Sequence, residues 1–425
     1  MSNRHPKGLW VCFTTELWER FGFYSLLWLL TLYMGHEFGW TTLKGWYYGV
    51  FIWAVFAFNF AGGWIADRFI GQIKAIKIGA MMMIAGYGLV ALSSARSKWP
   101  FTAGLVLVAI GTGFFKGNIS VIVGNLYTKE NEALKDAGYN IYYMGINIGA
   151  LLASIVISYV FKNYNYSFWA AAAGMVIALI TFSASGEIVR HADTKYRGAH
   201  PRAAVSTTAV VMPESEMVQR VVTLVTLFLI AILFWICYYQ NGSALTYFAD
   251  QSTRKTFPPQ FYSFFNCLCI IGLTLTILPF YKMLSKIGKE PSTAGKIFYG
   301  MIIMAVSMIV MMFAALAGGN RNANGVSSMW LISTYVVVSL AEILISPMGL
   351  SFVSKVAPPE LQGAMMGAWF FATGLGGFIA GLFSNWYDKL PHHQYFMILT
   401  GLLGLAAMLV LVFMKKLNRF SQQAA

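Results

Sequence analysis

The chain has 425 residues, of which 58% are hydrophobic, 16% aromatic and only 11% charged. An ordinary soluble domain carries about 25% charged residues, so this composition excludes that class and indicates a membrane protein with many spans. The formal net charge of +14 does not indicate nucleic-acid binding, because the basic residues are spread over short loops instead of gathering on one face.

Twelve apolar stretches are long enough to cross about 30 Å of hydrocarbon. They cover residues 10–34, 43–63, 73–93, 101–126, 138–160, 166–186, 218–240, 260–283, 294–316, 327–354, 363–387 and 394–415. An even number of spans puts both ends of the chain on one side of the membrane, and most of the loop Lys and Arg residues lie on that side. We therefore expect an all-α membrane protein with both termini cytoplasmic.

The first span contains three charged residues within one and a half helical turns, Glu16, Glu19 and Arg20. A charge at the bilayer centre costs at least about 2.5 to 3.5 kcal/mol, so it persists where it faces a protein interior or a water-filled cavity and finds a partner. Glu16 and Arg20 are four residues apart and share one face of a helix. We interpret this stretch as the wall of a polar cavity. A cluster that snorkels to the membrane surface is the alternative.

The loop after the second span reads G-W-I-A-D-R-F-I-G over residues 63–71. We expect Gly63 and Gly71 to allow a tight turn and a close approach of helices. Asp67 is placed to meet a helix N-terminus, and Arg68 to meet a carboxylate across an inner gate. A merely basic cytoplasmic loop is the alternative interpretation.

Two isolated charges lie deep in later spans, Lys116 in the fourth and Glu342 in the tenth. Intramembrane charges are functional by default, and a proton is what a lone carboxylate is expected to carry. Asn147 in the fifth span is explained equally by an interhelical hydrogen bond and by a ligand contact.

The end of the seventh span carries an aromatic and amide cluster that includes Trp235, Tyr239 and Gln240. It fits either a binding wall or an aromatic belt at the membrane surface. Glycines surround Trp369 in the eleventh span. They predict a broken, bending helix close to a cavity.

The longest polar segment, residues 187–217, separates six spans from six. We expect residues 1–186 to form an N-terminal six-helix bundle, residues 187–217 a cytoplasmic linker, and residues 218–425 a C-terminal six-helix bundle. Two six-helix halves are the organisation of the major facilitator transporters, whose substrate site lies between the halves near the membrane midplane.

Six motifs in order along the chain make the comparison more specific. They are E-x-x-E-R-F at 16–21, G-G-W-I-A-D-R-F-I-G at 62–71, F-F-K-G-N-I-S at 114–120, Y-Y-M-G-I-N-I-G-A at 142–150, W-x-x-x-x-Q-x-G-S at 235–243 and A-E-I-L-I-S-P-M-G-L-S at 341–351. With these motifs the chain resembles the proton-dependent oligopeptide transporters (POT), a branch of the major facilitators, as an atypical bacterial member. The resemblance implies proton-coupled uptake of di- and tripeptides by alternating access across the bacterial inner membrane.

The resemblance also implies residue roles. The proton-coupling positions fall on Glu16, Glu19, Arg20, Lys116 and Glu342, and Glu342 would receive the amino group of a peptide. The positions that line the family's peptide pocket fall on Tyr24, Asn147, Trp235, Asn266 and Trp369. A carboxylate at one end, a cation at the other and amides between them suit a zwitterionic peptide in a low-dielectric cavity.

The chain departs from the family pattern at several positions. Leu27 stands where the family has an arginine, Tyr239 where it has a glutamate, and Phe23 where it has a pocket tyrosine. Removing one member of a buried charge pair costs roughly 3 to 5 kcal/mol whereas removing both need not, so the joint loss at Leu27 and Tyr239 is self-consistent. Because of these changes, the alternative function is transport of a different, less anionic peptide-like or drug-like substrate, in the import or the export direction.

None of the six histidines lies mid-membrane, so a coupled proton must be carried by a carboxylate. We expect deprotonated Glu342 to pair with Lys116, and protonation to loosen that bridge. The sequence has no nucleophile paired with a base and no phosphate-binding loop, so it does not indicate an enzyme. It has no cluster with metal-ligand spacing and no ring of charges, so it indicates neither a metal site nor a channel. The expected partners are protons, a small peptide or peptide-like substrate and the lipid bilayer, with a functional monomer, no nucleic acid and no cofactor besides the proton gradient.

Overall fold

The computed structural model describes residues 4–128, 131, 134–161, 163–193, 213–320, 322–358 and 361–422. Within these ranges the chain is helical, and its only extended pairing consists of two isolated bridges. Most of the predicted linker, residues 194–212, lies outside the described residues. The linker residues that are described begin with two short helical turns, α7 and η4, and end where α8 begins at Glu214.

Twelve long helices are present in the described part of the chain. The first six are α1 (Lys7–His36), α2 (Leu43–Ile65), α3 (Gln72–Ala91), α4 (Trp99–Asn125), α5 (Lys135–Ile155) and α6 (Tyr164–Ala184). The other six are α8 (Glu214–Tyr238), α10 (Tyr262–Lys286), α11 (Thr293–Ala317), α12 (Ser328–Val356), α13 (Gln362–Ser384) and α14 (His392–Gln422). Shorter elements are η1 (Ala66–Ile70), η3 (Val156–Val160), α7 (Gly186–Val189), η4 (Arg190–Ala192), η5 (Tyr239–Gly242), α9 (Ala244–Gln251) and η6 (Pro259–Phe261).

Each predicted span falls on one long helix, and eleven of these helices are long and apolar enough to cross a membrane. The twelfth, α1, is 30 residues long and carries the three charges described above. Large apolar side chains such as Phe60, Leu275 and Val412 are about 70% exposed. Such surfaces are stable against lipid tails, and a helix satisfies its own backbone hydrogen bonds there.

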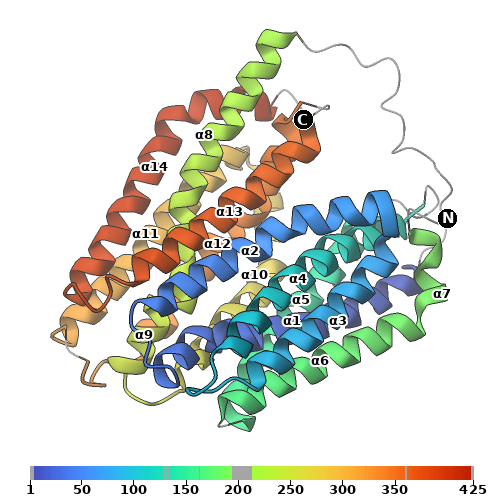
Figure 1. Ribbon diagram of the computed structural model, residues 1–425. Coiled ribbons are helices and arrows are strands. Elements are labelled where there is room, and N and C mark those ends of the chain that lie inside the picture. The colour runs from blue at the N-terminus through green and yellow to red at the C-terminus, as the bar shows by residue number, and fades with distance from the viewer. Residues whose placement is uncertain are drawn as a thin grey trace. The chain divides into compact units, whose positions relative to one another are not determined.

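Contacts divide the chain into two compact units (Figure 1). Unit 1 consists of Met1–Trp40 and Ala54–Ala209, and unit 2 consists of Thr41–Trp53 and Val210–Ala425. The boundary therefore runs through α2, whose first residues group with the helices that follow the linker.

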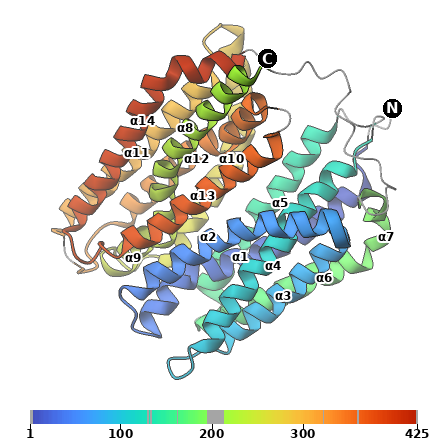
Figure 2. The ribbon, with the colours of Figure 1, turned by 45° about the horizontal axis from the view of Figure 1, so that its top comes forward.

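Within unit 1, α1 packs against α5 and α6, and α3 packs along α4 (Figure 2). The α3–α4 contact is close because glycines face each other across it. A Cβ on Gly79 would lie 2.5 Å from the carbonyl oxygen of Gly111, and one on Gly104 would lie 2.6 Å from that of Gly86. Small residues of this kind let helices approach where lipid provides no hydrophobic driving force.

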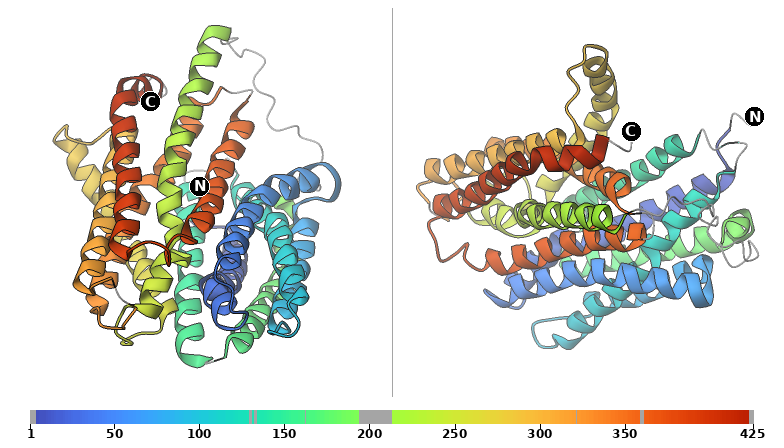
Figure 3. Two further views of the ribbon diagram at one scale, coloured as in Figure 1. Left: turned by 60° about the vertical axis from the view of Figure 1, so that its left-hand side comes forward. Right: turned by 90° about the horizontal axis from the view of Figure 1, so that it is seen from above.

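Within unit 2, α11 packs against α12 and α14, and α8 packs against α13 (Figure 3). The prediction that glycines break the eleventh span is wrong, because α13 runs uninterrupted from Gln362 to Ser384. Its glycines instead allow close packing: a Cβ on Gly376 would lie 2.4 Å from Cβ of Trp235, and one on Gly381 would lie 2.4 Å from the carbonyl oxygen of Gly45.

Candidate functional site

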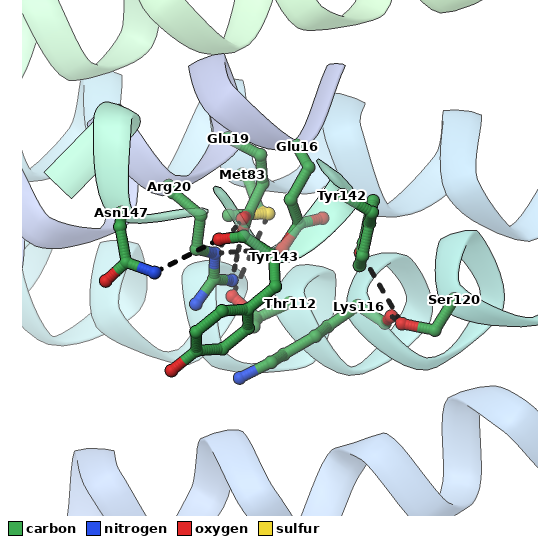
Figure 4. Close-up of polar contacts among 10 residues, drawn as sticks. All are labelled: Glu16, Glu19, Arg20, Met83, Thr112, Lys116, Ser120, Tyr142, Tyr143 and Asn147. Carbon is green, nitrogen blue, oxygen red and sulfur yellow. Dashed lines mark hydrogen bonds and ion pairs between the residues drawn. The ribbon is translucent and has the colours of Figure 1, made fainter. Parts of the chain in front are cut away.

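The three charges of α1 are buried inside unit 1 (Figure 4). Glu16 and Glu19 are fully buried, and Arg20 is 2% exposed. Arg20 donates from Nε and Nη2 to the two carboxylate oxygens of Glu19, the second at 2.5 Å, and its Nε lies 3.4 Å from Oε1 of Glu16. Two parallel hydrogen bonds are the strong geometry for an arginine and a carboxylate. Glu19 therefore holds Arg20, and Glu16 makes the longer contact.

A glycine on α5 lets this helix approach α1 beside the charges. A Cβ on Gly149 would lie 2.2 Å from the carbonyl oxygen of Leu17 and 3.1 Å from Cβ of Arg20. The motif at 142–150 thus fixes how near the side chains of α5 come to the buried charges.

Lys116 on α4 extends past the same group of charges (Figure 4). Its side chain is half-buried, and Nζ is 5.8 Å from the centre of the Phe56 ring. In the part of the chain that the structure describes, no carboxylate lies within ion-pair distance of Lys116. The structure brings Lys116 close to the α1 charges without pairing it.

Tyr24 and Asn147 flank these charges. The Tyr24 ring stacks on Trp28 with centroids 4.8 Å apart, and the Arg20 guanidinium lies 6.0 Å from its centre. Asn147 donates its amide to the carbonyl oxygen of Tyr143 at 3.1 Å (Figure 4). This hydrogen bond stays within α5 and does not join two helices.

In unit 2, Glu342 of α12 is half-buried and meets Asn266 of α10. The Asn266 amide donates to Oε2 of Glu342 at 3.2 Å and to the hydroxyl of Ser339 at 2.9 Å. Ser339 donates in turn to the carbonyl oxygen of Tyr335 at 2.7 Å. Tyr238 of α8 lies near Glu342. These contacts orient the carboxylate, and among the described residues no cation pairs with it.

Three of the predicted substrate residues are buried in the packing of unit 2. Trp235 is 7% exposed and Trp369 is 3% exposed, and a Cβ on Gly349 would lie 2.2 Å from the Trp369 ring. Gln240 is fully buried, and its Oε1 accepts a hydrogen bond from the Tyr395 hydroxyl at 2.8 Å. In the described conformation these side chains pack unit 2.

The positions that depart from the family pattern hold uncharged side chains. Phe23 is 6% exposed and its ring lies 4.7 Å from the guanidinium of Arg20, while Leu27 is 7% exposed within unit 1. Tyr239 in unit 2 accepts a hydrogen bond through its carbonyl oxygen from the Tyr48 hydroxyl at 3.0 Å.

The loop motif after α2 forms a turn of π-helix, η1, that ends at Gly71. Gly71 has φ +80°, a conformation that favours glycine, so its predicted role in a tight turn is confirmed. The predicted helix approach at Gly63 is wrong, because a Cβ there would meet no atom within 4 Å, whereas one on Gly62 would lie 2.4 Å from a backbone carbonyl oxygen of α4. The Arg68 guanidinium lies 5.4 Å from the centre of the Trp64 ring.

The carboxylate that caps α3 comes from the end of the η4 turn and not from the motif itself. Asp193 is 1% exposed and accepts hydrogen bonds from the backbone N–H groups of Gln72 at 3.2 Å and Ile73 at 3.1 Å. Asp67 instead accepts a hydrogen bond from the side-chain amide of Gln72 at 2.7 Å. Two carboxylates therefore hold the start of α3.

The candidate site offers the carboxylates of α1 and α12, the amine of Lys116, and the side-chain amides of Asn147 and Asn266. Each unit places a carboxylate in low dielectric, which suits the exchange of a proton or the binding of an ammonium group. Among the described residues, no group of three or more His, Cys, Asp or Glu side chains is arranged to hold a metal ion.

The sequence model of the POT family matches residues 73–212 and 199–398 of the chain. This chain belongs to the POT family. Four of the six motifs that carried the resemblance, those at 114–120, 142–150, 235–243 and 341–351, lie within the matched residues, and the helices of this POT chain have the major facilitator fold.

Relatives of this POT family chain match nearly its whole length. The uncharacterized transporter YclF of Bacillus subtilis (strain 168) is 30% identical, over 96% of this chain and 92% of its own. The peptide transporter YePEPT of Yersinia enterocolitica is 28% identical, over 91% and 90%. The crystal structure of a POT family transporter in complex with 5-aminolevulinic acid matches with a TM-score of 0.84 and 25% identity, over 97% of each chain.

Several polar residues near the candidate functional site were not predicted from the sequence. Tyr142 and Ser120 lie beside the α1 charges (Figure 4), Ser339 lies beside Glu342, and Asp193 caps α3. Ser339 precedes Glu342 by three residues, so helical spacing could have found it. The other contacts join separate helices or distant segments and leave no local signal.

Proposed function

We propose that this POT family protein is a proton-coupled symporter that takes up di- and tripeptides by alternating access. It acts as a monomer in the bacterial inner membrane with both termini cytoplasmic, and the proton gradient, not a cofactor, supplies the energy. Proton and substrate binding change which conformations are populated, which is the basis of alternating access.

The observation that carries the proposal is the unequal pairing of the two buried carboxylates on α1. Glu19 takes two hydrogen bonds from Arg20, whereas Glu16 has one longer ion pair at 3.4 Å. Glu16 can therefore gain or lose a proton while Arg20 keeps its main partner. Had both carboxylates been needed to hold Arg20, protonation would have left a buried charge unpaired at a cost of several kcal/mol.

The acid in unit 2 supports the second half of the function. Glu342 is held by Asn266 and has no cation paired to it among the described residues, so it is available to an ammonium group of the substrate. Relatives that carry the name peptide transporter agree with such a substrate.

A second candidate cargo is a less anionic peptide-like or drug-like compound, carried in the import or the export direction. Leu27 is buried and apolar, and Tyr239 is uncharged, so these two positions offer a substrate carboxylate no cation. A relative has been solved with 5-aminolevulinic acid, a small compound that is not a peptide.

The test is uptake of labelled dialanine into proteoliposomes with an inward proton gradient, and with the gradient collapsed by an ionophore. Accumulation above equilibrium that disappears with the gradient supports peptide symport. Glu16→Gln, Lys116→Ala and Glu342→Gln should each lose gradient-driven accumulation, and Glu214→Gln, an exposed carboxylate at the start of α8, is the matched control.

Normal gradient-driven uptake by all three variants would refute the coupling scheme. Absence of dialanine uptake by folded wild-type protein, together with weak competition by dialanine for another labelled amine, would favour the second cargo.

A further inference from the structure

The Glu16 carboxylate has few partners for a fully buried group. Beyond the ion pair with Arg20, neither of its oxygens meets a donor with full hydrogen-bond geometry among the described residues. Each donor near a buried carboxylate stabilises its charged form strongly, because burial excludes the water that could replace a lost donor.

Tyr142 of α5 is the uncharged donor that faces Glu16. The two side chains lie beside each other without the geometry of a hydrogen bond, and Tyr142 is 5% exposed. Figure 4 shows the tyrosine ring between Glu16 and Ser120. Loss of the hydroxyl alone would therefore change the surroundings of Glu16 and keep the aromatic packing.

Ser120 anchors the Tyr142 hydroxyl to α4. The two hydroxyl oxygens lie 3.4 Å apart, and Ser120 donates its own hydroxyl hydrogen to the carbonyl oxygen of Lys116 at 3.1 Å. The single hydroxyl hydrogen of Tyr142 can therefore be donated to the oxygen of Ser120 or toward Glu16. The polar contacts thus run from α1 through α5 to the turn of α4 that carries Lys116.

The other titratable groups around Glu16 do not substitute for this contact. On α1 they are Cys12, Glu19 and Arg20, and on α4 the group is Lys116. Cys12 is a weak donor, Glu19 repels the charged form, and Arg20 is engaged by Glu19.

We propose that Tyr142, anchored by Ser120, is a positioning residue that sets the pH range over which Glu16 exchanges its proton. This inference rests on the proton-coupled function proposed above. Tyr142 acts through Glu16 and does not itself contact substrate.

The test compares wild type, Tyr142→Phe and Ser120→Ala, with Tyr166→Phe as the matched control because Tyr166 is 63% exposed on α6 of the same unit. Gradient-driven dipeptide uptake is measured against pH, and counterflow of labelled dipeptide without a gradient is measured alongside. We expect the pH profile of Tyr142→Phe to move upward by roughly one pH unit, because the charged form of Glu16 loses a donor. Ser120→Ala should shift it less and downward, because the single Tyr142 hydroxyl hydrogen is then no longer shared with Ser120 and is free for the charged form of Glu16. Counterflow and the control should not change.

A second measurement does not depend on transport. Infrared spectra of the purified protein are recorded against pH, and the carboxylic acid C=O band that Glu16→Gln removes is followed in wild type and in Tyr142→Phe. An upward shift of its titration midpoint in the variant supports the inference. Superimposable midpoints and transport profiles overturn it while the proposed function stands, and a wild type without gradient-driven uptake refutes the proposed function separately.

Discussion

Gly149→Ala tests the close contact between α5 and α1 that places the polar side chains of α5 beside the buried charges. The new Cβ would lie 2.2 Å from the carbonyl oxygen of Leu17, which is backbone and cannot rotate away. The two helices must therefore separate by about 1 Å to reach van der Waals distance. Overpacking of this kind costs about 1 to 3 kcal/mol, and a clash with a backbone atom lies in the upper part of that range, at about 2 to 3 kcal/mol. The better helix propensity of alanine offsets about 1 kcal/mol. We expect a net loss of about 1 to 2 kcal/mol.

Gly117→Ala on α4 is the matched control. A Cβ there would meet no atom within 4 Å, so this variant gains helix propensity without a clash. Its thermal stability should equal or slightly exceed that of wild type.

The assay is thermal unfolding in detergent, with gradient-driven uptake measured in parallel. A loss of about 1 to 2 kcal/mol corresponds to a Tm lower by roughly 2 to 8 °C for a unit of this size. Uptake by Gly149→Ala should also fall, because the backbone of α1 next to Arg20 is displaced. A Gly149→Ala protein that melts at the wild-type temperature or above it would refute the packing argument.

Two further predictions concern the segments that flank the membrane helices. Asp193→Ala should lower Tm more than Asp193→Asn. Alanine leaves two backbone N–H groups of α3 unpaired, at a cost of about 0.5 to 2 kcal/mol, whereas asparagine still accepts a hydrogen bond from the start of the helix. Equal Tm values for the two variants would contradict this prediction. Lys296 donates a hydrogen bond to Glu290 at 2.7 Å, and this bond lowers the pKa of Glu290 below its ordinary value. A lowered pKa in the folded state adds stability above the unfolded pKa, and this stability is lost as pH falls through the folded pKa. The small Tm difference between wild type and Glu290→Gln should therefore be present at pH 7 and disappear on acidification, at a pH below the ordinary glutamate pKa of about 4.3. A difference that grows on acidification would refute the sign.

The positions of the spans were predictable because each depends only on local sequence. About twenty apolar residues in a row have few stable alternatives to a membrane helix, and each predicted stretch coincides with one. The tight turn at Gly71 was predictable for the same reason, since it depends on one residue's backbone. The prediction of a broken eleventh span was wrong because glycine has two uses, bending and close packing, and the sequence does not distinguish them.

The sequence by itself determined that this is a helical membrane protein of the POT family with costly charges on its first, fourth and tenth spans. Only the tertiary structure decided which partners those charges have. Glu16 and Glu19 are both within reach of Arg20 on one helix, yet Glu19 takes both strong hydrogen bonds, and Tyr142 from a distant segment faces Glu16. Asp193 caps a helix that begins 121 residues earlier in the chain. Helical periodicity fixes which face a residue occupies, whereas its partner depends on how closely another helix approaches that face, and that distance is set by packing between segments far apart in the sequence.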